Sequence, residues 1–107
     1  MSTEAENTKK APPGSETWRI PAKRDKSEYL EFHVKIEHLD ENPLIFEQYA
    51  AMSAARKPVD ATAVVIKGIH VGGCDVDKII SNPYAIRTLI PKVVDLMEVE
   101  EVEVKKN

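Results

Sequence analysis

Cysteine, long apolar runs and the glycine motifs of nucleotide-binding loops are nearly or wholly missing from this sequence, and each absence excludes a class of protein. Cys74 is the single cysteine, so the chain cannot form an internal disulfide or supply a cysteine-rich metal site. Neither the Walker pattern G-x-x-x-x-G-K-S/T nor the dinucleotide pattern G-x-G-x-x-G occurs. No apolar run approaches the ~18 residues of a membrane span, and no signal-peptide core follows Met1. We therefore expect a protein of a reducing cytoplasm, with no membrane-spanning segment and no cofactor.

Length and charge indicate a single, slightly acidic domain. A chain of 107 residues has no room for a second core, and its 31% charged and 42% apolar residues are ordinary values for a globular protein. The net charge of −3 disfavours a nucleic-acid partner, because domains that bind phosphates are usually basic. The basic cluster of Lys23, Arg24 and Lys26 is small for such a footprint.

The residue types that perform catalysis are present but scattered. His33, His38 and His70 lie on separate predicted elements, whereas a zinc site needs three or four converging ligands. Cys74 has acidic neighbours, which would raise the pKa of its thiol rather than activate it. The glutamates of residues 98–103 alternate with valines near the chain end, which is typical of a solvated surface. We therefore expect neither an enzyme nor a metal protein.

The first seventeen residues have the composition of a disordered tail. Their only apolar residues are Met1 and two alanines, too few to offset the entropy of ordering the backbone. We expect residues 1–17 to be disordered and residues 18–107 to form one small domain.

A β-hairpin is predicted next. Trp18–Ile20 is extended in character, and Pro21 restricts it to an edge strand. A polar turn follows over residues 23–27, and the second strand then alternates with period 2. Its apolar face carries Leu30, Phe32, Val34 and Ile36, and its polar face carries Glu31, His33, Lys35 and Glu37.

A helix is predicted over residues 44–56 from its flanking residues. Asn42 is a good N-cap, Pro43 suits the first helical position, and Pro58 ends the helix.

A second helix is predicted over residues 83–97 by the same signals. Asn82 is its N-cap and Pro83 its first residue, and we expect Pro91 to kink it because proline removes one helical hydrogen bond. Its apolar stripe consists of Ile86, Leu89, Ile90, Val93 and Met97.

Residues 59–71 are ambiguous between helix and strand. Thr62, Val64, Val65 and Ile66 favour a strand by propensity, while Asp60 is a fair N-cap for a helix. Asp75 is expected to cap a short turn through Ile80.

These elements together predict an α+β fold, an N-terminal β-hairpin packed on a C-terminal bundle of about three helices. We expect the hairpin to lie across the helix of residues 83–97, because an isolated hairpin is not stable. The predicted shared core consists of Leu30, Phe32, Val34, Ile36, Ile86, Leu89, Ile90 and Val93.

The layout resembles the small tail assembly chaperones of long-tailed bacteriophages. The resemblance covers residues 18–107 and includes a two-strand start, a helix opened by Asn42-Pro43, the bend Ile66-Lys-Gly-Ile-His-Val-Gly-Gly73, and the closing sequence Val99-Glu-Glu-Val-Glu-Val-Lys-Lys106. It implies that residues 59–71 are helical.

The resemblance also implies a function without catalysis. Members of that family coat the tape measure protein, keep its apolar helices soluble until tail tube protein assembles on it, and act in the host cytoplasm. A longer frameshifted product is common in the family and is not visible in a protein sequence. The alternative is a small α/β module that binds a nucleic acid or a regulatory protein partner.

A partner surface can be assigned from the apolar residues that exceed the needs of one small core. Ile79 and Ile80 precede the helix of residues 83–97, and Val99, Val102 and Val104 follow it. Exposed apolar surface marks interaction sites, so we expect these five residues to bind a partner, and the chain to form homo-oligomers.

Overall fold

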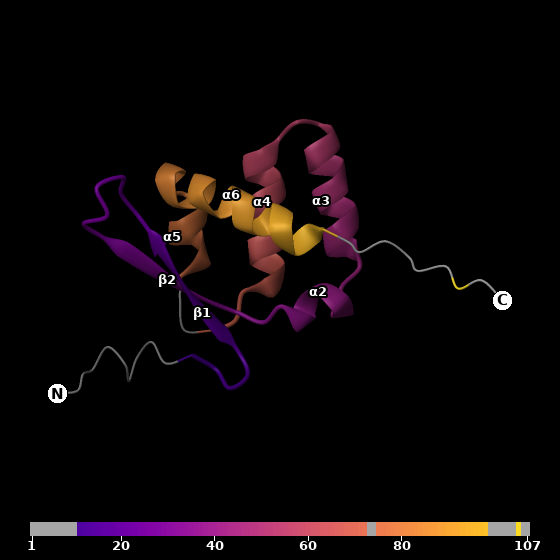
Figure 1. Ribbon diagram of the computed structural model, residues 1–107, viewed down its shortest axis with the longest axis horizontal. Coiled ribbons are helices and arrows are strands. Elements are labelled where there is room, and N and C mark those ends of the chain that lie inside the picture. The colour runs from indigo at the N-terminus through magenta and orange to yellow at the C-terminus, as the bar shows by residue number, and fades with distance from the viewer. Residues whose placement is uncertain (1–10, 73–74, 99–104, 106–107) are drawn as a thin grey trace.

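The computed structural model describes residues 11–72, 75–98 and 105 of the chain. Figure 1 shows an antiparallel hairpin at one end and helices over the rest of the molecule. The fold is therefore α+β, as predicted. The described elements, in chain order, are β1 (Glu16–Pro21), β2 (Tyr29–Val34), α2 (Glu37–Glu41), α3 (Leu44–Ala54), α4 (Pro58–Ile69), α5 (Val76–Ile80) and α6 (Pro83–Met97).

The hairpin is regular, and its first strand begins earlier than predicted. Glu16 pairs with Val34, and Thr17 pairs with His33. The disordered tail was predicted to extend through residue 17, and this boundary is wrong because cross-strand pairing holds these two residues. Residues 1–10 lie outside the described part of the chain.

The hairpin loop is the predicted polar turn. The Ala22 amide donates a hydrogen bond to the Glu28 carbonyl oxygen (2.8 Å), and Lys26 adopts a positive φ of 61°. Hydrogen bonds from the Ser27 hydroxyl and backbone N–H hold the pKa of Asp25 below its ordinary value. These contacts fix the loop on which the neighbouring Arg24 stands.

The polar face of β2 is not uniformly exposed to solvent. His33 was predicted to be on the solvated face, yet it is only 2% exposed. The chain leaving α4 runs beside the end of β2, where the Val71 amide donates to the His33 carbonyl oxygen (2.9 Å). The ring nitrogen Nδ1 of His33 lies 2.9 Å from Thr17 Oγ1, so the buried imidazole has a polar partner.

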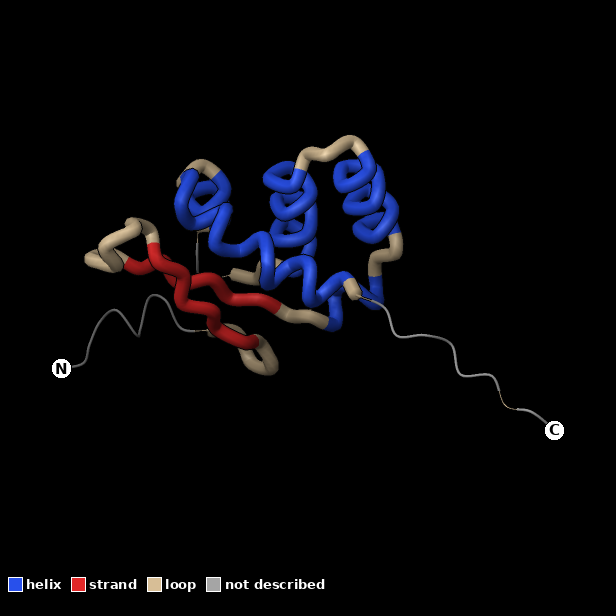
Figure 2. The backbone as a smooth tube through the Cα atoms, turned by 45° about the horizontal axis from the view of Figure 1, so that its top comes forward, coloured by secondary structure: helices blue, strands red, loops and turns tan. Residues whose placement is uncertain are grey.

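Helix α6 connects the hairpin to the helical part of the fold. It contacts α4, α5 and β1, and Figure 2 shows it between the hairpin and α4. Its N-terminus is capped as predicted, because the Asn82 side chain accepts hydrogen bonds from the Tyr84 and Ala85 amides (3.0 Å each). The helix continues through Pro91 to Met97.

Residues 58–69 form a helix, which resolves the ambiguous segment. Pro58 stands at the first turn, and the helix N-cap is Lys57 rather than the predicted Asp60. Helix α4 packs against both α3 and α6, and its buried residues therefore occupy more than one stripe. Gly68 allows α3 to approach closely, since a Cβ at this position would overlap with Ile45.

A short helix, α2, stands where the second strand was predicted to continue. β2 ends at Val34, and Ile36 is the N-cap of α2 rather than a strand residue. Asn42 lies at the C-cap of α2, and Pro43 occupies the N-cap position of α3 without a side-chain hydrogen bond. The predicted capping role of Asn42 is therefore wrong, because its backbone closes the preceding helix.

The predicted core is largely confirmed. Phe32, Val34, Ile86, Leu89 and Val93 are buried in one cluster. Leu30 and Ile36 are partly buried against it, whereas Ile90 is half-buried at the edge of α6.

Candidate functional site

An apolar hollow lies between α3 and α6, with α4 as its floor. We call it the α3–α6 groove. It has a volume of about 460 Å³ and is lined by Tyr49, Ser53, Arg56, Pro58, Ala61, Thr62, Ile90 and Val94. The groove forms because α3 and α6 both pack on α4 and not extensively on each other.

The groove has large apolar side chains on its rim. Val94 on α6 is 48% exposed, although most valines in proteins are buried. Phe46 on α3 is 36% exposed and lies three residues before Tyr49, so it continues the stripe of α3 that lines the groove. The floor residues Ala61 and Thr62 are small, which leaves room for the side chains of a bound segment.

Helix α3 exposes apolar surface because its sequence is apolar on more than one side. Leu44, Ile45 and Phe46 are consecutive, and consecutive helical residues point about 100° apart, so a single neighbouring helix cannot cover all three. Only Ile45 is buried, and Leu44 is 52% exposed on the flank away from the groove.

Of the five residues predicted to bind a partner, the two in the described part of the chain, Ile79 and Ile80, do not line the α3–α6 groove. Ile79 is 1% exposed and belongs to the core, and Ile80 is partly buried against the same core. Their assignment to an exposed surface is wrong for Ile79, because α5 folds back onto α6 and covers it. Val99, Val102 and Val104 lie outside the described residues.

The exposed residues could have been found from two sequence signals. The run Leu44-Ile-Phe46 opens a helix that has no clear polar face over its first turn. The pair Val93-Val94 places one valine in the core and the next outside it, because only one of two neighbours fits a helical stripe.

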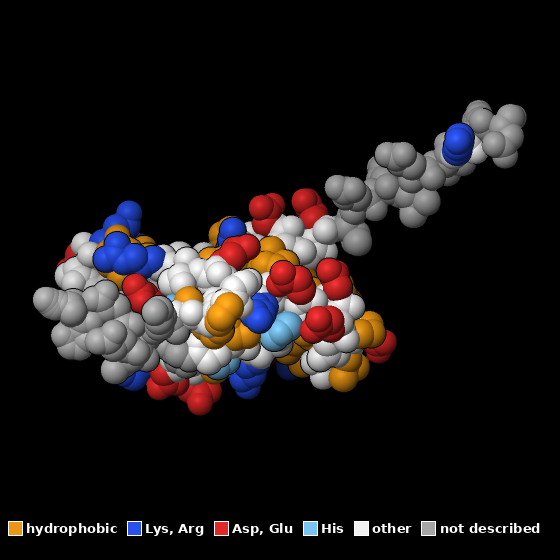
Figure 3. All heavy atoms as spheres, turned by 90° about the horizontal axis from the view of Figure 1, so that it is seen from below, with side chains coloured by type: hydrophobic (Ala, Val, Ile, Leu, Met, Phe, Trp, Pro, Cys, Tyr) orange, Lys and Arg blue, Asp and Glu red, His pale blue; other side chains and the backbone are white. Residues whose placement is uncertain are grey.

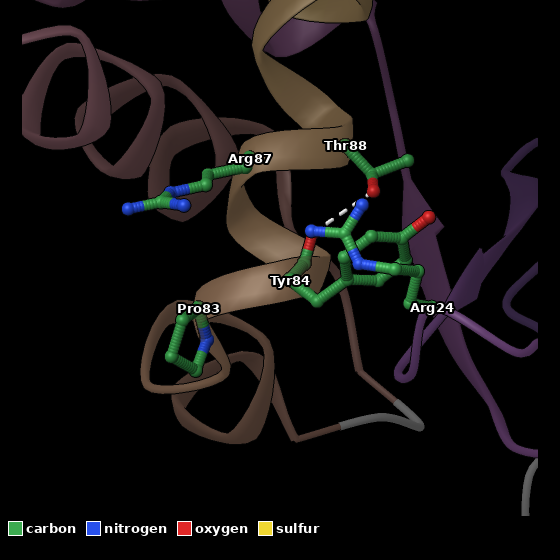
Figure 4. A pocket seen from close by; sticks show the side chains of 5 residues that line it. All are labelled: Arg24, Pro83, Tyr84, Arg87 and Thr88. Carbon is green, nitrogen blue, oxygen red and sulfur yellow. Dashed lines mark hydrogen bonds between the residues drawn. The ribbon is translucent and has the colours of Figure 1, made fainter.

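A second hollow lies at the first turn of α6, beside the hairpin loop. It has a volume of about 480 Å³ and is lined by Arg24, Pro83, Tyr84, Arg87 and Thr88. We call it the arginine hollow. Figure 4 shows Arg24 beside the Tyr84 ring and Arg87 projecting from the other side of α6. The Thr88 hydroxyl donates to the Tyr84 carbonyl oxygen (2.9 Å).

The guanidinium groups of the arginine hollow have no carboxylate partner among the described residues. The ion pair found among the described residues joins Lys23 Nζ to Glu28 Oε1, at 3.7 Å. The Arg24 guanidinium lies 5.5 Å from the centre of the Tyr84 ring, a cation–π contact that holds its position without neutralising it. The guanidinium groups of the hollow are thus able to pair with anionic groups.

No protein-family model matches the sequence, and comparison with curated proteins and with solved structures finds no significant match.

Neither hollow holds a group of side chains suited to metal binding within residues 11–72, 75–98 and 105. No group of three or more His, Cys, Asp or Glu side chains in this part of the chain could bind a metal ion. None of the described helices combines the length and apolar character that a membrane crossing requires. The α3–α6 groove can bury apolar side chains, and the arginine hollow can pair with carboxylates or phosphates.

Proposed function

We propose that this protein is a non-enzymatic binding protein that holds an apolar helix of a partner in the α3–α6 groove. The observation that carries the proposal is the exposure of Val94 on one wall of an apolar hollow, together with exposed Phe46 one helical turn before Tyr49 of the other wall. Exposed apolar side chains grouped around a hollow are typical of interaction sites.

The geometry of the groove suits a helix. Two helices packed on a third leave a channel between them, and an amphipathic helix can lie in such a channel with its apolar face inward. Val94, Ile90 and Tyr49 would then pack between the turns of the bound helix. Arg56 at one end of the channel favours an acidic residue on the partner.

The resemblance to tail assembly chaperones gives this activity a specific form. In that form the bound helix belongs to a tape measure protein, the released complex receives tail tube protein, and the site of action is the host cytoplasm. The groove is consistent with this role, because tape measure helices need their apolar stripes covered before assembly.

Charge substitutions on the groove test the proposal. We expect Phe46→Asp with Val94→Asp to abolish the ability of the protein to keep a co-expressed tape measure fragment soluble. An aspartate there would have to be buried without a partner, and each such burial typically weakens binding by more than tenfold.

Leu44→Asp is the matched control. Leu44 is the most exposed of the large apolar residues on α3, but it stands on the flank away from the groove. This variant should retain capture, and circular dichroism melts should show that all variants remain folded. The proposal fails if the wild type leaves the fragment insoluble, or if Leu44→Asp removes capture as completely as the groove variant.

A further inference from the structure

The described part of the molecule has a cationic hollow and, apart from it, an acidic end. Figure 3 shows Lys and Arg side chains gathered at one edge of the hairpin end, where Asp and Glu side chains also lie, and further Asp and Glu side chains gathered toward the end where the chain leaves α6. In the hairpin loop Lys23 pairs with Glu28, so the arginine hollow is the cationic site that has no carboxylate partner among the described residues. The acidic end contains α2 together with Asp95 and Glu98.

The helix dipole of α6 strengthens this polarity. Its N-terminal end, which carries a partial positive charge, lies at the arginine hollow. Its last turn has no basic residue to offset the partial negative charge at the C-terminal end. The chain that follows, Glu98-Val-Glu-Glu-Val-Glu103, has four carboxylates in six residues.

We propose that the arginine hollow binds the acidic segment Glu98–Glu103 of a second copy of this chain, so that copies associate head to tail. Arg24 and Arg87 supply the cationic partners, and neither has a carboxylate partner among the described residues. They flank the hollow rather than converge on one point (Figure 4). This arrangement suits a segment with spaced carboxylates better than a single small anion.

The length of the chain disfavours the same contact within one molecule for Arg24, because the segment would have to run straight back along α6. Tyr84, beneath Arg24, precedes Met97 by thirteen residues of α6, which is about 20 Å along the helix axis. Glu101 lies four residues beyond Met97, so an extended chain would bring it back by only about 13 Å. The backbone to Glu103 would have to be almost fully extended, over about 20 Å, and to reverse direction directly after α6. A second copy has no such limit.

Head-to-tail contacts join different surfaces of the two copies, so they can be repeated to form a ring or an open filament. Successive copies would then present their α3–α6 grooves in a row, which suits one long helical partner. That last consequence rests on the proposed function, whereas the association itself does not.

Charge reversal on each side of the contact, followed by mixing, tests the inference on the full chain. In sedimentation velocity at low ionic strength, the wild type should sediment faster as its concentration rises. This dependence should weaken as salt screens the contact. The double variant Arg24→Glu, Arg87→Glu should remain monomeric. So should the triple variant Glu100→Lys, Glu101→Lys, Glu103→Lys.

An equimolar mixture of these two variants should associate again, because each supplies the charges that the other lacks. Lys57→Glu with Lys67→Glu is the matched control. It changes the net charge by the same amount as the arginine variant, at the exposed N-cap of α4 and at an exposed position within α4, and should leave the wild-type association unchanged.

Three results would overturn the inference. The wild type could be monomeric at every concentration, its association could persist in the Arg24, Arg87 variant, or the mixture could stay monomeric. A labelled single-stranded oligothymidine provides a further check. If a monomeric wild type binds it and the arginine variant does not, the hollow serves a nucleic acid instead. Capture of the tape measure fragment by the arginine variant should persist, because its groove is intact, so the two proposals can fail separately.

Discussion

Gly68 determines how closely α3 can approach α4, and replacing it by alanine should destabilise the protein despite the better helix propensity of alanine. In a helix interior, alanine is favoured over glycine by about 1 kcal/mol. The added Cβ would overlap with Ile45 Cδ1 and lie 3.0 Å from Ile45 Cγ1. Ile45 is 3% exposed, so its side chain has little room to move, and overpacking of this kind costs about 1–3 kcal/mol. The net loss in the free energy of unfolding should be about 0–2 kcal/mol.

A double-mutant cycle with Ile45→Val separates the two contributions. Valine lacks the Cδ1 atom that overlaps, and the single change should cost about 0.5–1.5 kcal/mol. In the double variant, the alanine methyl should occupy the space that Cδ1 leaves. The two changes together should then cost less than their sum by about 1 kcal/mol or more.

Urea melts followed by circular dichroism would measure this coupling. Gly72→Ala is the control, because a Cβ at Gly72 meets no atom within 4 Å, and it should change stability by less than about 1 kcal/mol. If Gly68→Ala is stabilising, or if the cycle shows no coupling, then α3 does not pack on α4 through this contact.

Three further predictions concern the core, the cap of α6 and the hairpin loop. Leu89→Ala should lower the free energy of unfolding by about 2–5 kcal/mol, because Leu89 is 3% exposed in the core; a loss below about 0.5 kcal/mol in denaturant melts would contradict its burial. Asn82→Ala should cost about 0.5–2 kcal/mol by leaving two amides of α6 without their side-chain acceptor, whereas Asn82→Ser should retain most of the stability in the same melts. An NMR titration should give Asp25 a pKa below its ordinary value, and this pKa should rise in Ser27→Ala because the hydroxyl hydrogen bond is lost. Because the folded-state pKa is lowered, the associated stabilisation is present at neutral pH and is lost as the pH falls through that pKa.

Elements with strong local signals could be predicted from the sequence. The Asn82 cap and the Asp75 cap both appear, because each side chain needs only the next two or three amides to fulfil its role. The hairpin was predictable for a similar reason, since alternation in β2 and the polar turn after Pro21 are short-range features. Its N-terminal limit was not, because Glu16 and Thr17 are ordered by a strand that lies farther along the chain.

Elements that depend on tertiary packing could not be predicted from the sequence alone. Helix α4 contains Val64-Val65-Ile66, which favours a strand by propensity, but α3 and α6 cover two of its sides and satisfy an apolar run in helical form. The same reason explains the error at Ile79, whose burial depends on α5 folding back against α6. The groove was missed because it requires two helices to stand apart on a third.

The peripheral position of α3 has a consequence for the dynamics of the protein. α3 packs mainly on α4, and Ile45 is its only residue that is buried. Such a helix can detach in a partial opening while β1, β2, α4 and α6 remain assembled, since little buried surface holds it. Amide hydrogens of α3 would then exchange through this low-energy opening, whereas those of α6 would exchange only when the whole chain unfolds. An opening of this kind would move one wall of the α3–α6 groove relative to its floor and would change the width of the groove.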